Sequence, residues 1–275
     1  MNPVSDTVLI LAAGGASTRF GGGSKLFADL DGIPVFLHAV KTAASVLAPG
    51  SIVLSVPAAA EEDFRAAAKQ FLPDVPLHFT HGGATRTLSV LNALEAAAKL
   101  GEDRFELAAV HDAGRPMLTP ELLLACLDAA RIHGGAMACR KVAETVKRIT
   151  PDGFLGETVP RDELRTAETP QVFHFKALLN AYRLAAASNE LFTDDAQVME
   201  RFAPVRVFPV EHDFPNPKIT YRPDLELCRT LLKLRREGSG SRSRRRKPPS
   251  ALRVRSPAKT SCAAGTSGLF FFRSL

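Results

Sequence analysis

The sequence has no long apolar segment. None of its windows approaches the ~18–20 consecutive apolar residues that a membrane-spanning helix needs, so we expect none. Its first residues, Met-Asn-Pro-Val-Ser-Asp, also lack the basic and apolar pattern of a secretory signal. We therefore expect a cytoplasmic protein that has no membrane partner.

Cysteine is scarce as well. The four cysteines are widely spaced and form neither a Cys-x-x-Cys pair nor a cluster with histidine, which argues against a zinc site or a disulfide framework. Such cysteines fit a reducing compartment, where they pack as small apolar residues. They are Cys126, Cys139, Cys228 and Cys262.

Charge is unevenly distributed along the chain. Residues 235–275 hold 11 of the 35 Lys and Arg but one of the 29 Asp and Glu, which leaves 24 basic and 28 acidic side chains in residues 1–234. From Glu237 onward, Gly, Ser, Arg and Pro replace the apolar pattern. We therefore predict a folded domain over 1–236, mildly acidic and able to bury one substantial core, and a disordered basic tail over 237–275.

Short β-rich apolar runs alternate with helical patterns in the first half of the chain. The expected strands are 8–12, 51–56, 77–80, 107–111 and 135–140, and the expected helices are 35–45, 61–71, 86–99 and 120–132. This alternation predicts an α/β fold with a mainly parallel, Rossmann-like sheet and helices on both faces. Ligands bind such sheets at the carboxyl ends of the strands.

The alternation stops after about residue 141. Polar, strand-like segments surround a Pro-Asp-Gly turn, which predicts a projecting β-arm over about 141–172. Helical patterns return afterwards at 175–187 and 193–202, followed by a strand at 205–210 and a helix from 223 to about 234.

The end of the first expected strand has the composition of a phosphate site. Ala12, Ala13 and Gly14 are small, so that backbone N–H groups can approach phosphate oxygens, and Arg19 and Lys25 add cations. The spacing matches neither the Walker loop nor the dinucleotide fingerprint. A glycine-rich turn with solvated charges would explain the glycines alone. The combination of a strand, a loop of small residues and two spaced cations predicts a nucleoside triphosphate site.

Two further groups follow later strands. A glycine pair ending at Gly83 precedes a helix that carries Ser89, which alone is a weak signal. The strand at 107–111 is followed by Asp112 and Arg115, which suit Mg²⁺ and a phosphate respectively. A capping aspartate beside a surface arginine is the alternative, and His111 reads as a structural histidine.

Five motifs occur in the order and approximate spacing of one enzyme family. They are Ala12-Ala-Gly with Arg19 and Lys25; Gly82-Gly with Arg86, Ser89 and Val90; His111-Asp-Ala-x-Arg-Pro116; Thr169-Pro-Gln171; and Thr193-Asp194. Over residues 6–234 the chain resembles the 2-C-methyl-D-erythritol 4-phosphate cytidylyltransferases, CTP-dependent enzymes of the non-mevalonate isoprenoid pathway. Its first loop has one residue more than is usual in that family.

The resemblance implies roles for individual residues. It implies a nucleotidyltransferase fold, Mg²⁺ near Asp112, and a homodimer in which the β-arm reaches the partner's site. The catalytic residues would be Arg19, Lys25 and Lys218; the nucleotide-binding residues Ala12, Ala13, Gly14, Gly83, Ser89 and Asp112; and the residues binding the sugar phosphate Arg115, Thr145, Arg161, Thr169 and Thr193.

Two other functions stay open at this point. A sister cytidylyltransferase for ribitol 5-phosphate, or another polyol phosphate, would share the CTP half, although Val159-Pro-Arg161 and Thr169-Pro-Gln171 favour methylerythritol phosphate. The more distant alternative is a nucleic-acid-binding protein that uses the basic tail and has an inactive enzyme fold. We do not expect nucleic acid binding, because a basic run without a folded reader specifies little beyond charge.

Overall fold

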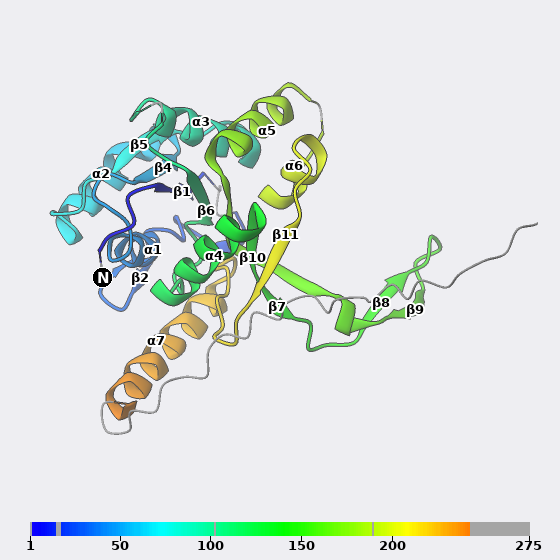
Figure 1. Ribbon diagram of the computed structural model, residues 1–275. Coiled ribbons are helices and arrows are strands. Elements are labelled where there is room, and N and C mark those ends of the chain that lie inside the picture. The colour runs from blue at the N-terminus through cyan, green and yellow to red at the C-terminus, as the bar shows by residue number, and fades with distance from the viewer. Residues whose placement is uncertain (1, 15–17, 102, 189, 243–275) are drawn as a thin grey trace, which may run out of the picture. The chain divides into compact units, whose positions relative to one another are not determined.

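Seven strands form one sheet in the computed structural model, in the order β11-β7-β10-β6-β1-β4-β5 (Figure 1). The structure describes residues 2–14, 18–101, 103–188 and 190–242. All neighbouring strands run parallel except β10, which is antiparallel to both of its neighbours. The predicted α/β fold is thus confirmed. The strands are β1 (Thr7–Ala12), β4 (Ile52–Val56), β5 (His78–His81), β6 (Leu107–Asp112), β7 (Gly135–Lys141), β10 (Arg165–His174) and β11 (Val207–Glu211).

Helices cover both faces of this sheet, so β1 is buried on both sides. Its side chains alternate: Leu9 and Leu11 join one apolar cluster, whereas Val8 and Ile10 join the other. The first cluster packs against α1 (Val35–Ala44), α2 (Glu61–Phe71), α4 (Pro120–His133) and α7 (Arg222–Arg242). The second packs against α3 (Arg86–Ala98), α5 (Phe175–Ala187) and α6 (Asp195–Phe202).

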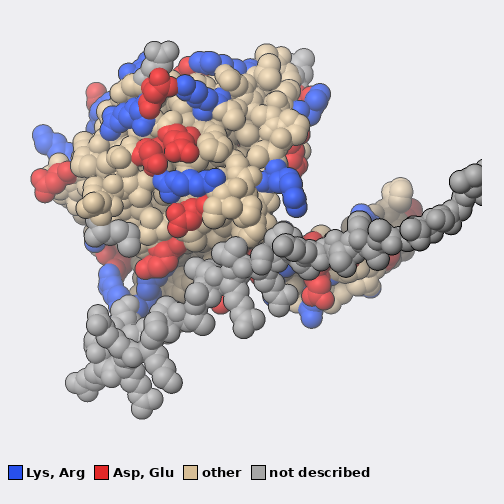
Figure 2. All heavy atoms as spheres, viewed as in Figure 1, with Lys and Arg blue, Asp and Glu red and all other residues tan. Residues whose placement is uncertain are grey.

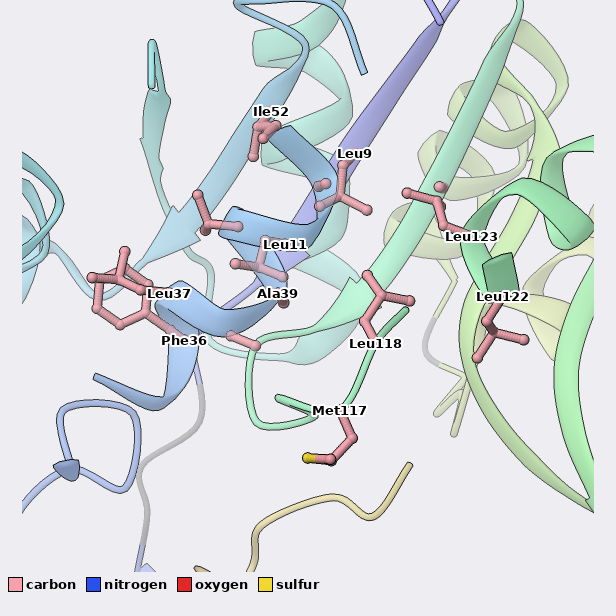
Figure 3. Packing of buried hydrophobic residues seen from close by; sticks show 14 of the residues in the cluster. Leu9, Leu11, Phe36, Leu37, Ala39, Ile52, Met117, Leu118, Leu122 and Leu123 are labelled. Carbon is pink, nitrogen blue, oxygen red and sulfur yellow. The ribbon is translucent and has the colours of Figure 1, made fainter. Parts of the chain in front are cut away.

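The first cluster holds the carboxyl half of β1 in place. Figure 3 shows Leu9 and Leu11 of β1 among side chains from α1, β4 and the segment that leads into α4. Phe36 of α1 also stacks edge-on against Phe64 of α2, with ring centroids 4.8 Å apart. This packing fixes β1, and the first loop begins at the carboxyl end of that strand.

Strand β10 differs from the prediction of an arm over 141–172. Its first residues pair with β7 at the root of the arm, but Glu168 to Phe173 are buried in the main sheet. The polar composition of β10 did not indicate a place in the main sheet. Its polar side chains can be buried there because they form hydrogen bonds to neighbouring elements. A register shift between Ala167 and Gln171 accommodates Pro170, which lacks an N–H.

The projecting part of the arm is a hairpin of β8 (Val146–Ile149) and β9 (Leu155–Val159). In Figure 1 it lies beyond the ends of β7 and β10, away from the helices. A second small hairpin, β2 (Asp29–Leu30) and β3 (Ile33–Pro34), was not predicted. Three 3-10 turns, at Thr18–Phe20, Ala58–Ala60 and Arg161–Glu163, complete the elements.

Helix α7 continues further than the sequence predicts. It ends at Arg242 rather than near residue 234, so residues 237–242 of the expected disordered tail are helical. Residues 243–275 lie outside the described part of the chain. The chain divides into two units, Met1–Arg236 and Glu237–Leu275. Within the described residues, every helix is too short or too polar to span a bilayer.

Candidate active site

The carboxyl ends of three parallel strands lie side by side at one edge of the sheet. The register pairs Ala12 of β1 with Ser55 of β4 on one side and with Asp112 of β6 on the other. Gly82, which directly follows β5, donates its N–H to the carbonyl of Val56 at 2.8 Å. The first three sequence motifs therefore meet at one edge, as ligand sites of doubly wound sheets do.

The glycine loop after β5 is built around Ser89. The N–H of Gly83 donates to Ser89 Oγ at 3.1 Å, and this hydroxyl donates to the carbonyl of Thr85 at 2.9 Å. A Cβ on Gly83 would lie 2.3 Å from that of Leu88, so only glycine fits there. A Cβ on Gly14 would lie 3.2 Å from Ser89 Oγ. The predicted nucleotide residues Gly14 and Ser89, from the first and second loops, are thus close neighbours.

Asp112 lies among three cations. Its carboxylate oxygens are 2.9 Å from Lys218 Nζ, 3.4 Å from Arg115 Nε and 3.7 Å from Arg86 Nε. Burial opposes ionisation of this carboxyl group, but the charges of the three cations outweigh burial and lower its pKa. Asp112 is therefore an ionised carboxylate that holds three cationic side chains at the edge of the sheet.

Lys25 lies close to the same group. Its Nζ donates to the carbonyl of Ile219 at 2.7 Å, next to Lys218 in the chain. Burial, assisted by the charge of Lys218, lowers the pKa of Lys25, while the charge of Asp112 acts in the opposite sense. The predicted catalytic residues Lys25 and Lys218 are thus brought together although 193 positions separate them in the sequence.

The third predicted catalytic residue, Arg19, is exposed on the 3-10 turn that follows the first loop. Its guanidinium is 5.9 Å from the ring centroid of Tyr221. Arg222 donates to the carbonyl of Gly21 at 2.9 Å, which ties this turn to the start of α7. The extra residue of the first loop falls near residues 15–17, outside the described residues.

Arg86 is held by an acid that the sequence analysis missed. Its two terminal nitrogens each donate to one oxygen of the fully buried Asp195 at 2.8 Å. The hydroxyl of Tyr182 donates to the same carboxylate. Burial disfavours the charge on Arg86, but Asp195 outweighs it and raises the pKa of the guanidinium. The one available signal was the position of Asp195 directly after the Thr193-Asp194 motif.

A chain of hydrogen bonds fixes Asp112 and Arg115 relative to each other. His111 is fully buried, and its Nε2 donates to the carbonyl of Arg115 at 3.0 Å. Thr169 donates its hydroxyl to His111 Nδ1 at 2.9 Å and accepts the N–H of Asp112 at 3.1 Å. Burial lowers the pKa of His111 to about 4, so the ring is neutral, as this pattern requires. Thr169 thus supports the site through the backbone of Asp112.

Three predicted residues do not join this cluster directly. Thr145 and Arg161 are exposed on the β-arm, where Arg161 donates to the carbonyl of Ala143. Thr193 is exposed before α6, and both its N–H and its hydroxyl donate to the side chain of Gln197. Their roles toward a substrate remain predictions.

A single carboxylate at this edge suits Mg²⁺ better than it suits a cation that takes all of its ligands from the protein. In the part of the chain that the structure describes, no three His, Cys, Asp or Glu side chains gather into a metal-binding group. Mg²⁺ commonly uses one or two carboxylates and takes its other ligands from water and substrate phosphates. Asp112 is the one carboxylate of the cluster, and it lies beside Ala12 at the start of the first loop.

Comparison with known proteins identifies the family. The family model described as 2-C-methyl-D-erythritol 4-phosphate cytidylyltransferase matches residues 7–234. The enzyme of that name from Bacillus cereus is 33% identical over 230 residues, covering 83% of this chain and 99% of the relative. The one from Rhodopirellula baltica is 36% identical over 241 residues, covering 84% and 97%. The chain also matches, at 38% identity, 55% of the length of the bifunctional enzyme IspD/IspF of Sinorhizobium medicae.

Solved structures agree with this result. The 4-diphosphocytidyl-2C-methyl-D-erythritol synthase of Anaerococcus prevotii aligns with a TM-score of 0.71 and 27% identity, covering 83% of this chain and 99% of that one. The 2-C-methyl-D-erythritol 4-phosphate cytidylyltransferase of Thermus thermophilus aligns with a TM-score of 0.65 and 27% identity, covering 82% and 98%. The resemblance drawn from five motifs is confirmed: the chain belongs to the 2-C-methyl-D-erythritol 4-phosphate cytidylyltransferase family of nucleotidyltransferases.

Proposed function

We propose that this chain transfers a cytidylyl group from CTP to 2-C-methyl-D-erythritol 4-phosphate, giving 4-diphosphocytidyl-2-C-methyl-D-erythritol and pyrophosphate in isoprenoid biosynthesis. The observation that carries the proposal is the cluster of Lys218, Arg115 and Arg86 around Asp112, with Lys25 beside it. A reaction between two phosphate-bearing substrates needs such a concentration of positive charge.

The chemistry requires no nucleophile from the protein. A phosphomonoester with a second pKa of about 6 is largely dianionic at neutral pH. One of its oxygens forms a bond to the α-phosphorus of CTP, while the bond from that phosphorus to the oxygen bridging to the β-phosphate breaks. Pyrophosphate leaves with that electron pair. What the protein supplies is positioning and stabilisation of the negative charge that develops at the α-phosphorus.

The cations divide between the two substrates in this proposal. Arg19 and Lys25, at the first loop, bind the triphosphate of CTP, and Lys218 lies at the reacting phosphate. Arg115, which also donates to the carbonyl of Asn216 at 2.8 Å, holds the sugar phosphate. Mg²⁺, held by Asp112 and the nucleotide, would neutralise part of the triphosphate charge.

The nucleotide base is assigned to the edge formed by the first two loops. Ser89 Oγ accepts the N–H of Gly83 and would lie 3.2 Å from a Cβ placed on Gly14, and both glycines are exposed. If this edge forms a tight pocket, a pyrimidine fits it better than a larger purine. We infer that Gly83 and Ser89 contact the cytosine and that Ala12, Ala13 and Gly14 hold the nucleotide by their backbone.

The β-arm suggests how the acceptor site is completed. We propose a homodimer in which Thr145 and Arg161 of one subunit reach the sugar phosphate bound by the other. Their exposure on a hairpin remote from their own subunit's helices supports this arrangement. Thr169 and Thr193 are proposed to contribute from within the subunit.

Pyrophosphate release with a panel of substrates tests the proposal. We expect release when CTP, Mg²⁺ and 2-C-methyl-D-erythritol 4-phosphate are all present, and none when the acceptor is omitted or ATP replaces CTP. The names of the relatives favour this acceptor over a polyol phosphate. Faster release with ribitol 5-phosphate would overturn the assignment of the acceptor, and no release with any acceptor would overturn the function.

A further inference from the structure

The loop that carries Arg115 and the segment that carries Lys218 have no regular secondary structure. The 113–119 loop follows β6 and the 212–221 segment follows β11, and both lie outside the helices and strands. Since neither is held by the repeating hydrogen bonds of a helix or a sheet, individual contacts determine where Arg115 and Lys218 lie relative to each other. A residue that bridges the loop and the segment can therefore set the spacing of the two cations.

Two bridges come from the loop and the segment themselves. Arg115 Nη1 donates to the carbonyl of Asn216 at 2.8 Å, and the backbone N–H of Ile219 donates to the carbonyl of Gly114 at 2.8 Å. One bridge thus starts from Arg115 itself, and the other lies next to Lys218 in the chain. These contacts already make the positions of the two cations depend on each other.

Helix α7 supplies a third bridge from outside the site. Arg235 Nη2 donates to the carbonyl of Met117 at 2.8 Å, and Arg235 Cζ lies 4.3 Å from the centroid of the Phe214 ring. One guanidinium thus joins the 113–119 loop, two residues after Arg115, to the 212–221 segment, four residues before Lys218. A planar guanidinium suits this task, because it can stack on an aromatic ring while its edge donates hydrogen bonds.

Arg235 is partly buried, although charged side chains are mostly exposed. Burial lowers the pKa of its guanidinium, while the charge of Glu121 on α4 acts in the opposite sense. The carbonyl of Met117 and the ring of Phe214 offset the cost of removing the cation from water. Arg235 therefore belongs to the folded body, although it stands at the start of the basic run and directly after residue 234, where the family match ends.

The helix that carries Arg235 is itself fixed against the site. Cys228 and Leu231 of α7 are buried in the same apolar cluster as Met117 and Ile219. Close-packed side chains resist displacement, so this face of α7 holds the helix in place. The guanidinium therefore reaches the loop and the segment from a rigid support.

We propose that Arg235 is a positioning residue for the acceptor: its bridge between Met117 and Phe214 sets the spacing of Arg115 and Lys218. Arg235 touches neither substrate in this arrangement. Its effect should therefore appear in the use of the acceptor and not in the binding of CTP. This inference rests on the proposed function, in which Arg115 holds the acceptor phosphate and Lys218 lies at the reacting phosphate.

The test compares Arg235→Leu with the wild-type chain, both full-length and at a temperature at which both are folded. A misplacement of about 1 Å can cost about a hundredfold in rate, so kcat/KM for 2-C-methyl-D-erythritol 4-phosphate should fall at least about tenfold. The Kd for CTP, measured by calorimetry without acceptor, should stay within about twofold of the wild-type value, because the bridge lies on the acceptor side. An unchanged kcat/KM for the acceptor, or an equal loss of CTP affinity, would overturn the inference.

Arg104→Leu is the matched control. Arg104 Nη2 donates to the carbonyl of Pro49 at 3.2 Å, and Arg104 Cζ lies 4.9 Å from the ring centroid of Phe105. The variant thus removes the same two kinds of contact before the amino end of β6, the end of the strand opposite to Asp112. It should keep the wild-type kcat/KM for the acceptor, and a loss equal to that of Arg235→Leu would count against a specific role of the bridge.

A double-mutant cycle tests the contact with Phe214. Phe214→Leu removes the ring and should lower kcat/KM for the acceptor about fivefold, as expected for loss of a cation–π contact. If the two residues act through one bridge, adding Phe214→Leu to Arg235→Leu should lower this value by less than about twofold more. Losses that multiply would show that the two residues act independently and would contradict the bridge.

Hydrogen–deuterium exchange examines the bridge without turnover. In Arg235→Leu, the N–H of Ile219 that donates to Gly114 should exchange about tenfold faster than in the wild type, because loss of a hydrogen bond from a charged group eases local opening. In Arg104→Leu it should exchange at the wild-type rate. Equal exchange in Arg235→Leu and the wild type would contradict the bridge. A wild type without any cytidylyl transfer contradicts the proposed function instead, and the exchange rates still decide on the bridge.

Discussion

At the residue scale, Asp112 prepares the site before any substrate arrives. Its carboxylate is 2.9 Å from Lys218 and 3.4 Å from Arg115, and the hydrogen-bond chain through Thr169 and His111 fixes the backbone on both sides of it. Cations already in place need little reorganisation when charge develops in the transition state. Asp112 therefore holds Lys218 and Arg115 in place, while Asp195 holds Arg86.

Replacement of Lys218 tests whether a cation that is already in place stabilises the charge at the reacting phosphate. Lys218→Ala should lower kcat by about a hundredfold or more, since one preorganised donor contributes about 3 kcal/mol to transition-state stabilisation. Lys218 is 44% exposed, so the melting temperature should change little. Lys176→Ala, which removes an exposed lysine paired with Asp103, is the control and should keep full turnover. Near-normal turnover of Lys218→Ala would remove Lys218 from the mechanism.

The buried neutral His111 makes a prediction about pH and stability. Its pKa of about 4 lies below the ordinary value of 6.5, so the unfolded chain binds a proton that the folded chain does not between these values. Stability from this group is complete above pH 6.5 and is lost as pH falls toward 4. Without divalent cations, the wild-type free energy of unfolding should fall between pH 7 and 4 by about 3 kcal/mol more than that of His111→Gln. Parallel pH curves from urea unfolding would show that folding does not lower the pKa of His111, contrary to this prediction.

At the scale of elements, the helices and strands that have a local apolar pattern could be predicted from the sequence. Six parallel strands and seven helices follow from apolar periodicity and turn residues, and Glu61–Phe71 and Phe175–Ala187 have the predicted bounds. Strand-like structure was predicted over β10, but its place in the main sheet was not, because its polar residues look exposed until their partners on other elements are known. The end of α7 was misplaced because Gly and Ser in 238–241 are poor helix formers, yet the helix continues through them.

The site could be predicted only in part for the same reason. Small and cationic residues that follow strands identify the loops of the site in the sequence. The structure brings together four of the predicted residues: Lys25, Lys218, Asp112 and Arg115. Asp195 carries only one weak local signal, its position after Thr193-Asp194, because its partner Arg86 is 109 positions away in the sequence. Long-range polar pairs of this kind appear only when the fold is known.

The β-arm, as an element, makes a prediction about subunit exchange. If Arg161 serves the partner's site, a mixture of Arg161→Ala and Lys25→Ala chains should regain about a quarter of wild-type activity, because half of the dimers are hybrids with one complete site each. Mixing Lys25→Ala with Lys218→Ala is the control and should regain nothing, since both residues belong to one subunit's cluster. No recovery in the first mixture, despite verified exchange, would place Arg161 outside the partner's site.

At the scale of the whole molecule, the basic tail and the body differ in charge. On the face shown in Figure 2, basic and acidic side chains of the described chain alternate over the body. The positive net charge of +6 arises in residues 235–275. The body's chemistry should therefore be independent of the tail.

Deletion of residues 243–275 distinguishes an enzyme from a protein that binds nucleic acid through the charge of the tail. The truncated chain should keep its kcat and its KM for CTP within about twofold, because every residue assigned to the site lies between Ala12 and Lys218 in the sequence, and Arg235 also precedes the deleted segment. A nucleic-acid-binding protein would instead lose a strongly salt-dependent affinity with the tail. Loss of cytidylyl transfer on truncation, with an unchanged melting temperature, would show that the tail takes part in catalysis.

The most direct test of the account is a competition between acceptors. Full-length protein, CTP and Mg²⁺ are incubated with equal concentrations of 2-C-methyl-D-erythritol 4-phosphate and ribitol 5-phosphate, and the two cytidylyl products are quantified by mass spectrometry. We expect 4-diphosphocytidyl-2-C-methyl-D-erythritol to exceed the ribitol product by about a hundredfold, the discrimination that about 2.7 kcal/mol of differential transition-state binding provides. An excess of the ribitol product, or neither product, would contradict the account.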